Sequence, residues 1–265
     1  MPEEPAQNIS GGIEGDGRAV EFPRGEPATR AEAVIDRLGG LYWQKQYGGQ
    51  DAFTCLVRTI LSQNTSDVAS QPAHNSLVAR YGKEDLAAVL ADAAHDDLAA
   101  TIKSAGLYNQ KATVIIDAAS RILDEYGSAA AFDEFVRDEN PATVRPALLD
   151  IRGVGPKTAD CVLLFAGGRD GVFPVDTHIH RIYRRMGIAP PDADHEEVRE
   201  VLERDVPAAK CGFGHTASIQ FGREYCTARK PACLDDPDAC PLADLCDQIG
   251  VYPVAGEFVD PADAA

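Results

Sequence analysis

The sequence predicts an all-α protein. Over most of the 265 residues, apolar side chains recur at three- and four-residue steps, the spacing of one face of a helix. Very little of the chain alternates apolar and polar residues with the two-residue period of a strand. No run approaches the ~20 apolar residues needed to cross a bilayer, so we expect no membrane segment.

The helical pattern begins near Thr29. Residues 1–28 are rich in Gly, Pro and Glu without a sustained period, so we expect a disordered acidic extension there. From Thr29 onward, Ala33, Val34 and Leu38 follow helical spacing. Further helices are expected at 52–61, 67–81, 84–91, 96–104, 110–126, 131–137, 159–166, 195–204 and 215–221, and one more begins near residue 176.

The most informative segment is a glycine-containing turn at 149–159, which reads LDIRGVGPKTA. Gly153 and Gly155 allow a tight turn whose backbone N–H groups converge on an anion. Pro156 suits the first position of a helix, because its missing N–H costs nothing there. Turn and helix dipole would then point at the same phosphate.

Lys157 follows in the first turn of that helix. The positive end of the helix dipole disfavours a cation there and favours the neutral amine that a lysine nucleophile needs. Asp176 comes directly after an apolar stretch, where a new helix begins. A plain turn with an exposed lysine and a simple helix cap at Asp176 are the alternatives. Together the two residues form a candidate nucleophile and carboxylate pair.

Four cysteines lie within twenty-one residues near the C-terminus: Cys226, Cys233, Cys240 and Cys246. We expect no signal peptide and a core that needs no disulfides, which disfavours disulfide bonds. Structural zinc sites usually use close cysteine pairs, and no C-x-x-C occurs here. Four thiolates on irregular loop can also enclose an iron–sulfur cluster. The spacing alone leaves iron–sulfur, zinc and unliganded thiols open, whereas Cys55 and Cys161 read as core residues.

The charge of the chain is −17, whereas most DNA-binding domains are basic. Between Arg145 and Arg185, however, seven basic residues face four acidic ones, so this window is a local basic island. The acidity and the low lysine content (seven) suggest a cell with high internal salt. Salt at 1 M shortens the Debye length to about 3 Å, so hydrogen bonds from the turn would carry more of the binding than long-range charge.

Several ordered blocks carry a family resemblance. The turn at 151–159 followed by Val175-Asp176-Thr177-His178, together with the blocks ILSQNTSD at 60–67, GLYNQKA at 106–112 and GREYCTARKP at 222–231, resembles the helix-hairpin-helix DNA glycosylases, and within them the endonuclease III family. The blocks run in order from about residue 60 to 246. Several ordered motifs are far more specific than any one of them.

This resemblance implies two helical lobes and a cofactor. A six-helix lobe at 44–170 would contain the hairpin, and 29–43 with 171–250 would form a cluster lobe, followed by a tail at 251–265. Asp176 would then lie at the mouth of the groove between the lobes. The four cysteines would hold a [4Fe–4S] cluster. One departure concerns Cys233 and Cys240, which are separated by six residues where the family usually has two; we expect the polar insert at 234–239 to bulge outward.

The resemblance also implies a mechanism on double-stranded DNA that carries a damaged base or an abasic site. The base is flipped out, Lys157 attacks C1′ with Asp176 as its carboxylate, and a Schiff base leads to β-elimination. The implied DNA contacts are Gly153 and Gly155 on a phosphate, Asn64 (or Gln63) and Leu107 in the space left by the base, His178 lining the groove or capping its helix, and Arg229 and Lys230 on phosphates.

Lys157 favours a bifunctional glycosylase and AP lyase acting on oxidised pyrimidines, because mismatch glycosylases of the superfamily typically lack this lysine. A monofunctional thymine/uracil or adenine mismatch glycosylase is the first alternative. A non-catalytic helix-hairpin-helix DNA-binding protein is the second, although phosphate binding requires neither Lys157 nor Asp176. We expect a monomeric protein in the cytoplasm, associated with the nucleoid.

Overall fold

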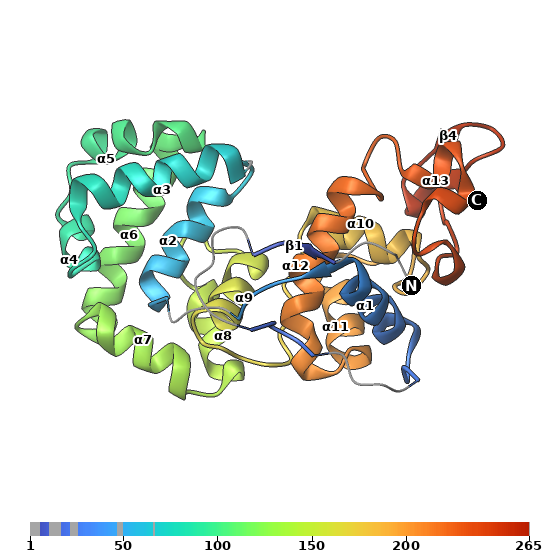
Figure 1. Cartoon of the computed structure of the whole chain (residues 1–265). Helices are drawn as coiled ribbons and strands as arrows, with labels where there is room; N and C mark the ends of the chain where they lie inside the picture. The colour runs from blue at the N-terminus through green and yellow to red at the C-terminus, as the bar shows by residue number, and fades with distance from the viewer. Residues whose placement is uncertain (1–5, 11–16, 22–25, 47–49, 66, 265) are drawn as a thin grey trace. The chain divides into compact units, whose positions relative to one another are not determined.

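The computed structural model describes residues 6–10, 17–21, 26–46, 50–65 and 67–264 (Figure 1). The chain divides into two compact units. Unit 1 comprises Met1–Gly48 and Asp170–Ala265, and unit 2 comprises Gly49–Arg169. The sequence placed the boundaries at 43/44 and 170/171. The second unit is therefore inserted, in sequence, between two segments of the first.

Helices form nearly all the regular structure of the described residues, which confirms the all-α prediction. In unit 2 they are α2 (Ala52–Ser62), α3 (Asp67–Tyr81), α4 (Leu86–Ala91), α5 (His95–Thr101), the 3-10 helix η1 (Lys103–Ala105), α6 (Tyr108–Tyr126), α7 (Ala129–Asp138), α8 (Pro141–Leu149) and α9 (Pro156–Phe165). The described part of unit 2 thus has eight α-helices rather than the six that the resemblance implied. Two of the eight, α4 and α5, are short helices of six and seven residues.

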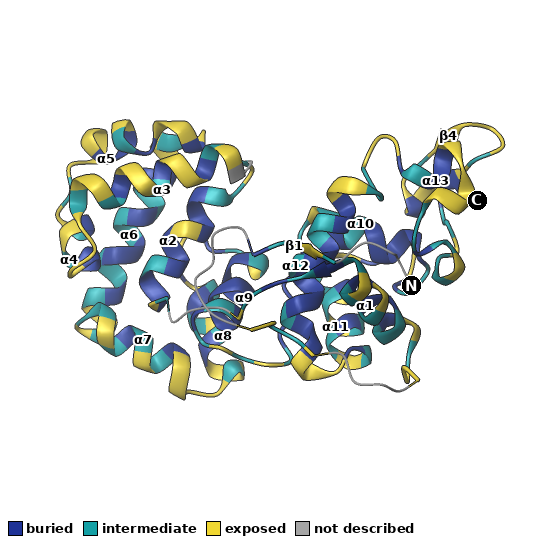
Figure 2. Ribbon diagram, in the orientation of Figure 1, coloured by how far each residue is buried: buried dark blue, intermediate teal, exposed yellow. Residues whose placement is uncertain are grey.

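Helix α2 lies in the core of unit 2. Asp51 caps it by accepting a hydrogen bond from the Thr54 N–H, and eight of its eleven residues are buried. It packs against α3, α6, α7 and α9. Figure 2 shows exposed residues on the outer sides of α3, α5 and α7. The two ends of α2 are thereby fixed, and its last turn leads into the segment that carries Gln63 and Asn64.

Helix α8 was not predicted from the sequence. It begins after Asn140, whose side chain accepts from the Ala142 N–H, and Pro141 occupies its first position. Pro146 lies inside the helix and breaks the usual signal, because proline removes one backbone hydrogen bond. Packing of Val144 and Leu148 into the core outweighs this loss, and α8 packs against α9 to complete the hairpin.

Unit 1 combines an N-terminal helix with the C-terminal half of the chain. Its elements are β1 (Gln7–Asn8), α1 (Arg30–Leu41), β2 (Tyr42–Trp43), α10 (Thr177–Arg185), α11 (His195–Asp205), α12 (Ala208–Glu224), α13 (Ala232–Asp235), the 3-10 helices η2 (Pro237–Ala239) and η3 (Ala243–Leu245), β3 (Val251–Tyr252), β4 (Glu257–Phe258) and η4 (Pro261–Asp263). The core of this unit gathers side chains from α1, α10, α11 and α12.

Helix α12 extends well beyond the predicted 215–221, to Ala208–Glu224. Its glycines lower helix propensity and hid its length. They serve close packing instead: a Cβ on Gly214 would lie 2.8 Å from the Phe173 ring and 2.9 Å from Ile35 Cδ1. A Cβ on Gly222 would lie 2.8 Å from His178 Nδ1, so α12 and α10 approach closely.

The terminal segments contain short paired strands. Gln7–Asn8 pairs in parallel with Tyr42–Trp43, and Ser10 is buried, so disorder does not describe residues 7–10. Asn8 pairs with Trp43, directly after α1, and the Ile9 N–H donates to the Trp43 carbonyl oxygen. Other parts of 1–28 lie outside the described residues. The tail at 251–265 holds β3 and β4, which pair antiparallel. No helix among the described residues has the length and apolarity that a bilayer crossing requires.

Candidate active site and metal centre

The turn between α8 and α9 requires a glycine at only one of its two glycine positions. Gly153 adopts φ +81°, and a Cβ there would lie 2.6 Å from a methyl carbon of Val114. Gly155 is extended (φ −96°), with open space where a side chain would be. The protein itself thus demands glycine at 153, whereas Gly155 leaves room for a bound group to approach the backbone.

Lys157 is the second residue of α9 and is half-buried. The helix begins at Gly155, which has no side chain to cap it, and the N–H groups of Thr158 and Ala159 both turn back to the Gly155 carbonyl oxygen. A helix N-terminus without a side-chain cap favours an anion. The structure thus places Lys157 beside the uncapped N-terminus of α9, and phosphate binding there stays a prediction.

Gln63 follows α2 and holds the hairpin. Its Nε2 donates to the Gly153 carbonyl oxygen at 3.1 Å and to Thr158 Oγ1 at 3.0 Å. The sequence offered Gln63 as an alternative to Asn64 for a DNA contact. Its Nε2 is engaged within unit 2, at both sides of the turn that carries Gly155, and a DNA contact by Gln63 stays a prediction.

Asn64 and Leu107, which are expected from the sequence in the space left by the base, are both exposed in the structure. Asn64 has φ 51° and Leu107 has φ 47°, and the Leu107 side chain is 55 % exposed. The left-handed region is unusual for any residue with a Cβ, and more so for leucine. Strain of this kind persists only where surrounding structure enforces it, and it clusters at functional sites.

Asp176 lies in unit 1, at the N-cap of α10. One carboxylate oxygen, Oδ1, accepts the N–H groups of both His178 and Ile179 at 2.9 Å. The cap reading is therefore confirmed. Because both bonds end on Oδ1, capping leaves Oδ2 for a second role.

His178 is half-buried between α10 and α12. Its Nδ1 lies 3.2 Å from the Arg181 guanidinium, and burial lowers the pKa of the imidazole. Arg181 in turn donates to the Cys226 carbonyl oxygen. Arg181 thus connects the helix of Asp176 with the cysteine segment, and His178 lies against its guanidinium.

The basic window at 145–185 is largely internal. Arg184 and Arg185 are buried, and Arg145 pairs with buried Asp160 at 2.6 Å. Arg169 donates to the Glu139 carbonyl oxygen. Most basic side chains of this window are therefore buried or bonded to other groups of the protein. A charge count along the sequence cannot foresee this result. Arg152, with an 80 % exposed side chain, remains at the surface.

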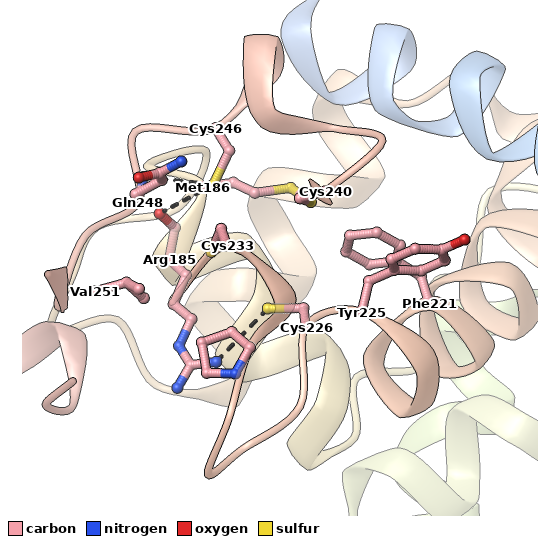
Figure 3. A pocket seen from close by; sticks show the side chains of 11 residues that line it. Arg185, Met186, Phe221, Tyr225, Cys226, Cys233, Cys240, Cys246, Gln248 and Val251 are labelled. Atoms are coloured by element: carbon pink, nitrogen blue, oxygen red, sulfur yellow. Dashed lines mark hydrogen bonds between the residues drawn. The ribbon is translucent and has the colours of Figure 1, made fainter. Parts of the chain in front are cut away.

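The four C-terminal cysteines line one pocket (Figure 3). Met186, Phe221 and Tyr225 form part of its apolar wall. Burial raises the pKa of the Cys240 thiol to about 11 and that of Cys246 to about 12. Metal binding must displace these protons, since thiolates are the ligands.

Arg185 provides a test of the fit between this cavity and an iron–sulfur cluster. Its guanidinium lies 3.6 Å from Cys226 Sγ and donates to the carbonyl oxygens of Thr227 and Ala228. Its Nε is buried and has no hydrogen-bond partner among the residues that the structure describes. A buried donor beside four thiols suits the sulfur atoms of a cluster, which accept hydrogen bonds. The Gln248 N–H also donates to Cys246 Sγ at 3.3 Å. Sequence reasoning missed Arg185 because it reads as one more surface arginine.

The insert between Cys233 and Cys240 bulges outward, as predicted. Residues 235–239 are exposed, and Leu234 alone turns inward, beside Cys233 and Val251. Arg229 is exposed. Lys230 pairs with Asp235 at 2.8 Å, and both side chains remain about two-thirds exposed. Both basic residues stay predictions as phosphate contacts.

Comparisons with known proteins agree with this geometry. The chain matches the HhH-GPD superfamily of base excision DNA repair proteins over residues 57–208, and the iron–sulfur binding domain of endonuclease III over 226–246. The chain belongs to the endonuclease III family. It is a DNA glycosylase with a [4Fe–4S] cluster. The residues that line the cysteine pocket described above fit such a cluster.

Relatives match along most of the chain. Endonuclease III of Bacillus subtilis is 32 % identical over 81 % of this chain and 90 % of its own. The Escherichia coli enzyme is 33 % identical over 74 % and 83 %. Among solved structures, a trapped covalent endonuclease III–DNA intermediate has a TM-score of 0.63 at 29 % identity, covering 75 % of this chain and 84 % of that one. A thermostable thymine-DNA glycosylase shares the fold, with a TM-score of 0.65 at 21 % identity, over 83 % and 96 %.

Proposed function

We propose that this glycosylase is bifunctional: it excises oxidised pyrimidines from duplex DNA and then nicks the strand as an AP lyase. The observation that carries the proposal is Lys157, held half-buried in the first turn of α9 directly after the turn at Gly155. A relative's solved structure is a trapped covalent complex with DNA, which supports an attacking nucleophile in the family.

The reaction assigns each residue one task. The Nζ lone pair of Lys157 attacks C1′, the N-glycosidic bond breaks, and the base leaves with its electron pair and takes up a proton. The attached amine then gives up one proton, the C1′–O4′ bond of the sugar breaks, and O4′ takes up a proton, which leaves a protonated Schiff base between Nζ and C1′. Removal of a C2′ proton then expels the 3′ phosphate by β-elimination. Asp176 Oδ2 would accept a proton or steady the positive charge on the sugar, while Oδ1 keeps capping α10.

Phosphate binding would come from the N-terminus of α9. Gly155 leaves open space there, and the helix dipole favours a negative group. Asn64 and Leu107 would occupy the gap left by the flipped base. The cluster supplies a crosslink among the four cysteine segments when bound, whereas Lys157 and Asp176 perform the chemistry.

Borohydride trapping tests this proposal. Duplex DNA with one thymine glycol is incubated with the wild type, Lys157→Ala and Lys83→Ala, an exposed lysine on the segment before α4. We expect a covalent adduct and a nick with the wild type and Lys83→Ala, and neither with Lys157→Ala. Base release without an adduct would identify a monofunctional glycosylase. No base release by the wild type would reject oxidised pyrimidines as the substrate.

Asp176→Asn separates catalysis from capping. Asparagine also caps helices well, so we expect an unchanged melting temperature. Base release should nevertheless fall by about 100-fold, the lower end of general acid–base effects. Wild-type rates in this variant would remove Asp176 from the mechanism.

A further inference from the structure

Lys111 is a buried lysine that the mechanism does not use. It lies in the first turns of α6, and only 3 % of it is exposed. Lysine is almost never fully buried without a partner, because removing an ammonium from water is expensive. Desolvation accordingly lowers the pKa of Lys111. Such a residue needs an explanation in the structure around it.

The Lys111 ammonium donates to three oxygens on two segments of unit 2. On the first segment it reaches the Leu61 carbonyl oxygen at 2.8 Å and Thr65 Oγ1 at 3.2 Å. On the second it reaches the Ala105 carbonyl oxygen at 2.8 Å. The Thr65 hydroxyl also donates to the Ala105 carbonyl oxygen, so the two segments are joined twice.

These two segments carry the two strained, exposed residues described above. Asn64 lies between Leu61 and Thr65, and Leu107 follows Ala105 by two positions. The backbone of Lys111 is also tied to this point, because its N–H donates to the Leu107 carbonyl oxygen at 3.0 Å. A single side chain therefore connects the backbones that hold Asn64 and Leu107.

We propose that Lys111 is a positioning residue: its buried ammonium fixes the spacing of Asn64 and Leu107, so that both enter the duplex together beside the flipped nucleotide. This inference rests on the proposed roles of Asn64 and Leu107. Its physical reason is preorganisation, since loops already held in the bound geometry lose less freedom on binding. A charged donor suits this role because its hydrogen bonds are stronger than those of a neutral group.

The test measures duplex binding with a stable abasic analogue, tetrahydrofuran, placed opposite 2-aminopurine. Lys111→Met keeps the apolar stem and removes all three hydrogen bonds. Lys103→Met is the matched control, because Lys103 is exposed on η1 and loses the same charge. We expect Lys111→Met to lower the preference for abasic over intact duplex about tenfold, and to weaken the change in 2-aminopurine fluorescence. Lys103→Met should keep the wild-type preference.

A second variant guards against misfolding of the first. Thr65→Val removes the hydroxyl that bonds to both the Ala105 carbonyl oxygen and the Lys111 ammonium, and it leaves the charge of the protein unchanged. It should move both readouts in the same direction by a smaller factor. Wild-type preference and fluorescence in both variants would overturn the proposal. If the wild type binds abasic and intact duplex equally well, the proposed roles of Asn64 and Leu107 fail instead. The failure of the proposed function is thus distinguished from the failure of the Lys111 proposal.

Discussion

The side-chain amide of Gln63 donates to the carbonyl oxygen of Gly153 across a distance of 3.1 Å. The same nitrogen donates to Thr158 Oγ1, so the end of α2 is tied to both sides of the hairpin turn. Gly153 and Thr158 lie 90 and 95 positions after Gln63 in the sequence, and these bonds hold all three residues in one local structure. The turn owes its shape to a side chain from outside the hairpin as well as to its own glycines.

Gln63→Ala should lower the free energy of unfolding by about 1–2 kcal/mol, because two hydrogen bonds are lost. Urea denaturation measures the change. Gln71→Ala, at an exposed position of α3, is the control and should stay within about 0.5 kcal/mol of the wild type. Equal stability of both variants would mean that the Gln63 amide does not support the turn.

The two glycines of the turn should respond differently to alanine. Gly153→Ala forces a positive φ on alanine and meets Val114, so it should destabilise the protein by at least about 1–2 kcal/mol. Gly155→Ala should leave stability within about 0.5 kcal/mol, because its backbone is extended and the space is open. It should nevertheless weaken DNA binding in a filter or anisotropy assay, since the methyl group occupies the proposed phosphate approach. Unchanged DNA affinity would argue against a phosphate there.

The buried ion pair of Arg145 and Asp160 should matter more than any surface pair. Arg145→Ala leaves the Asp160 carboxylate, only 2 % exposed, without its guanidinium partner. We expect a loss of about 3–5 kcal/mol in urea denaturation. The exposed pair of Arg152 and Asp117 supplies the comparison, and Arg152→Ala should change stability by less than about 0.5 kcal/mol. A small effect at Arg145 would mean that the Asp160 carboxylate does not depend on this guanidinium.

His74 should make the protein acid-sensitive. Its Nε2 is buried without a partner among the described residues, and burial, aided by Arg58 and Lys83, lowers its pKa from 6.5 to about 4. The unfolded chain therefore binds a proton between these two values that the folded protein does not. The contribution of His74 to stability is present above pH 6.5 and falls as the pH drops toward 4.

His74→Gln should flatten this fall in denaturation curves taken across that pH range. His95→Gln is the control: His95 is exposed, and its hydrogen bond to Asp96 raises its pKa, so its removal should leave the acid sensitivity in place. An identical pH dependence in the wild type and His74→Gln would assign the effect to other groups.

Cys246→Ala should lose the cluster, whereas Cys211→Ala should keep it. Both cysteines belong to unit 1, but Cys246 lines the pocket and Cys211 is buried in the helical core. Iron and acid-labile sulfide analysis measures the difference. Metal loss should also lower the melting temperature, because binding free energy of the metal contributes to folding. Full iron content in Cys246→Ala would exclude it as a ligand.

The sequence predicted the helices and the chemical groups better than their connections. Periodic apolar residues located α3 to the residue, and the cysteine spacing and the family motifs located the metal centre. Helix α8 escaped prediction because Pro146 masks it, and α12 was shortened because its glycines serve close packing. In both helices tertiary packing overrides local propensity.

Charge was the least predictable property. Arg184 and Arg185 read as part of a basic surface, yet both are buried against oxygen and sulfur acceptors. Lys111 lies in a family motif, but its proposed role follows from its hydrogen bonds to the Leu61 and Ala105 carbonyl oxygens. A pattern of side chains in the sequence does not show which backbone oxygens accept such bonds. Backbone acceptors are present at almost every residue, so their use by a particular lysine must be seen in three dimensions.

The interrupted sequence of unit 1 has a consequence for biosynthesis. Because the ribosome releases the chain from its N-terminus, α1 emerges long before α12, the helix on which it packs. Unit 2 can complete its core in the interval, since its sequence is continuous from Gly49 to Arg169. The four cysteines of the pocket follow unit 2 in the sequence, so they are translated after that unit and iron delivery must come later still. Once all of unit 2 has emerged from the ribosome, it can fold while the N-terminal helix α1 still awaits its partner α12.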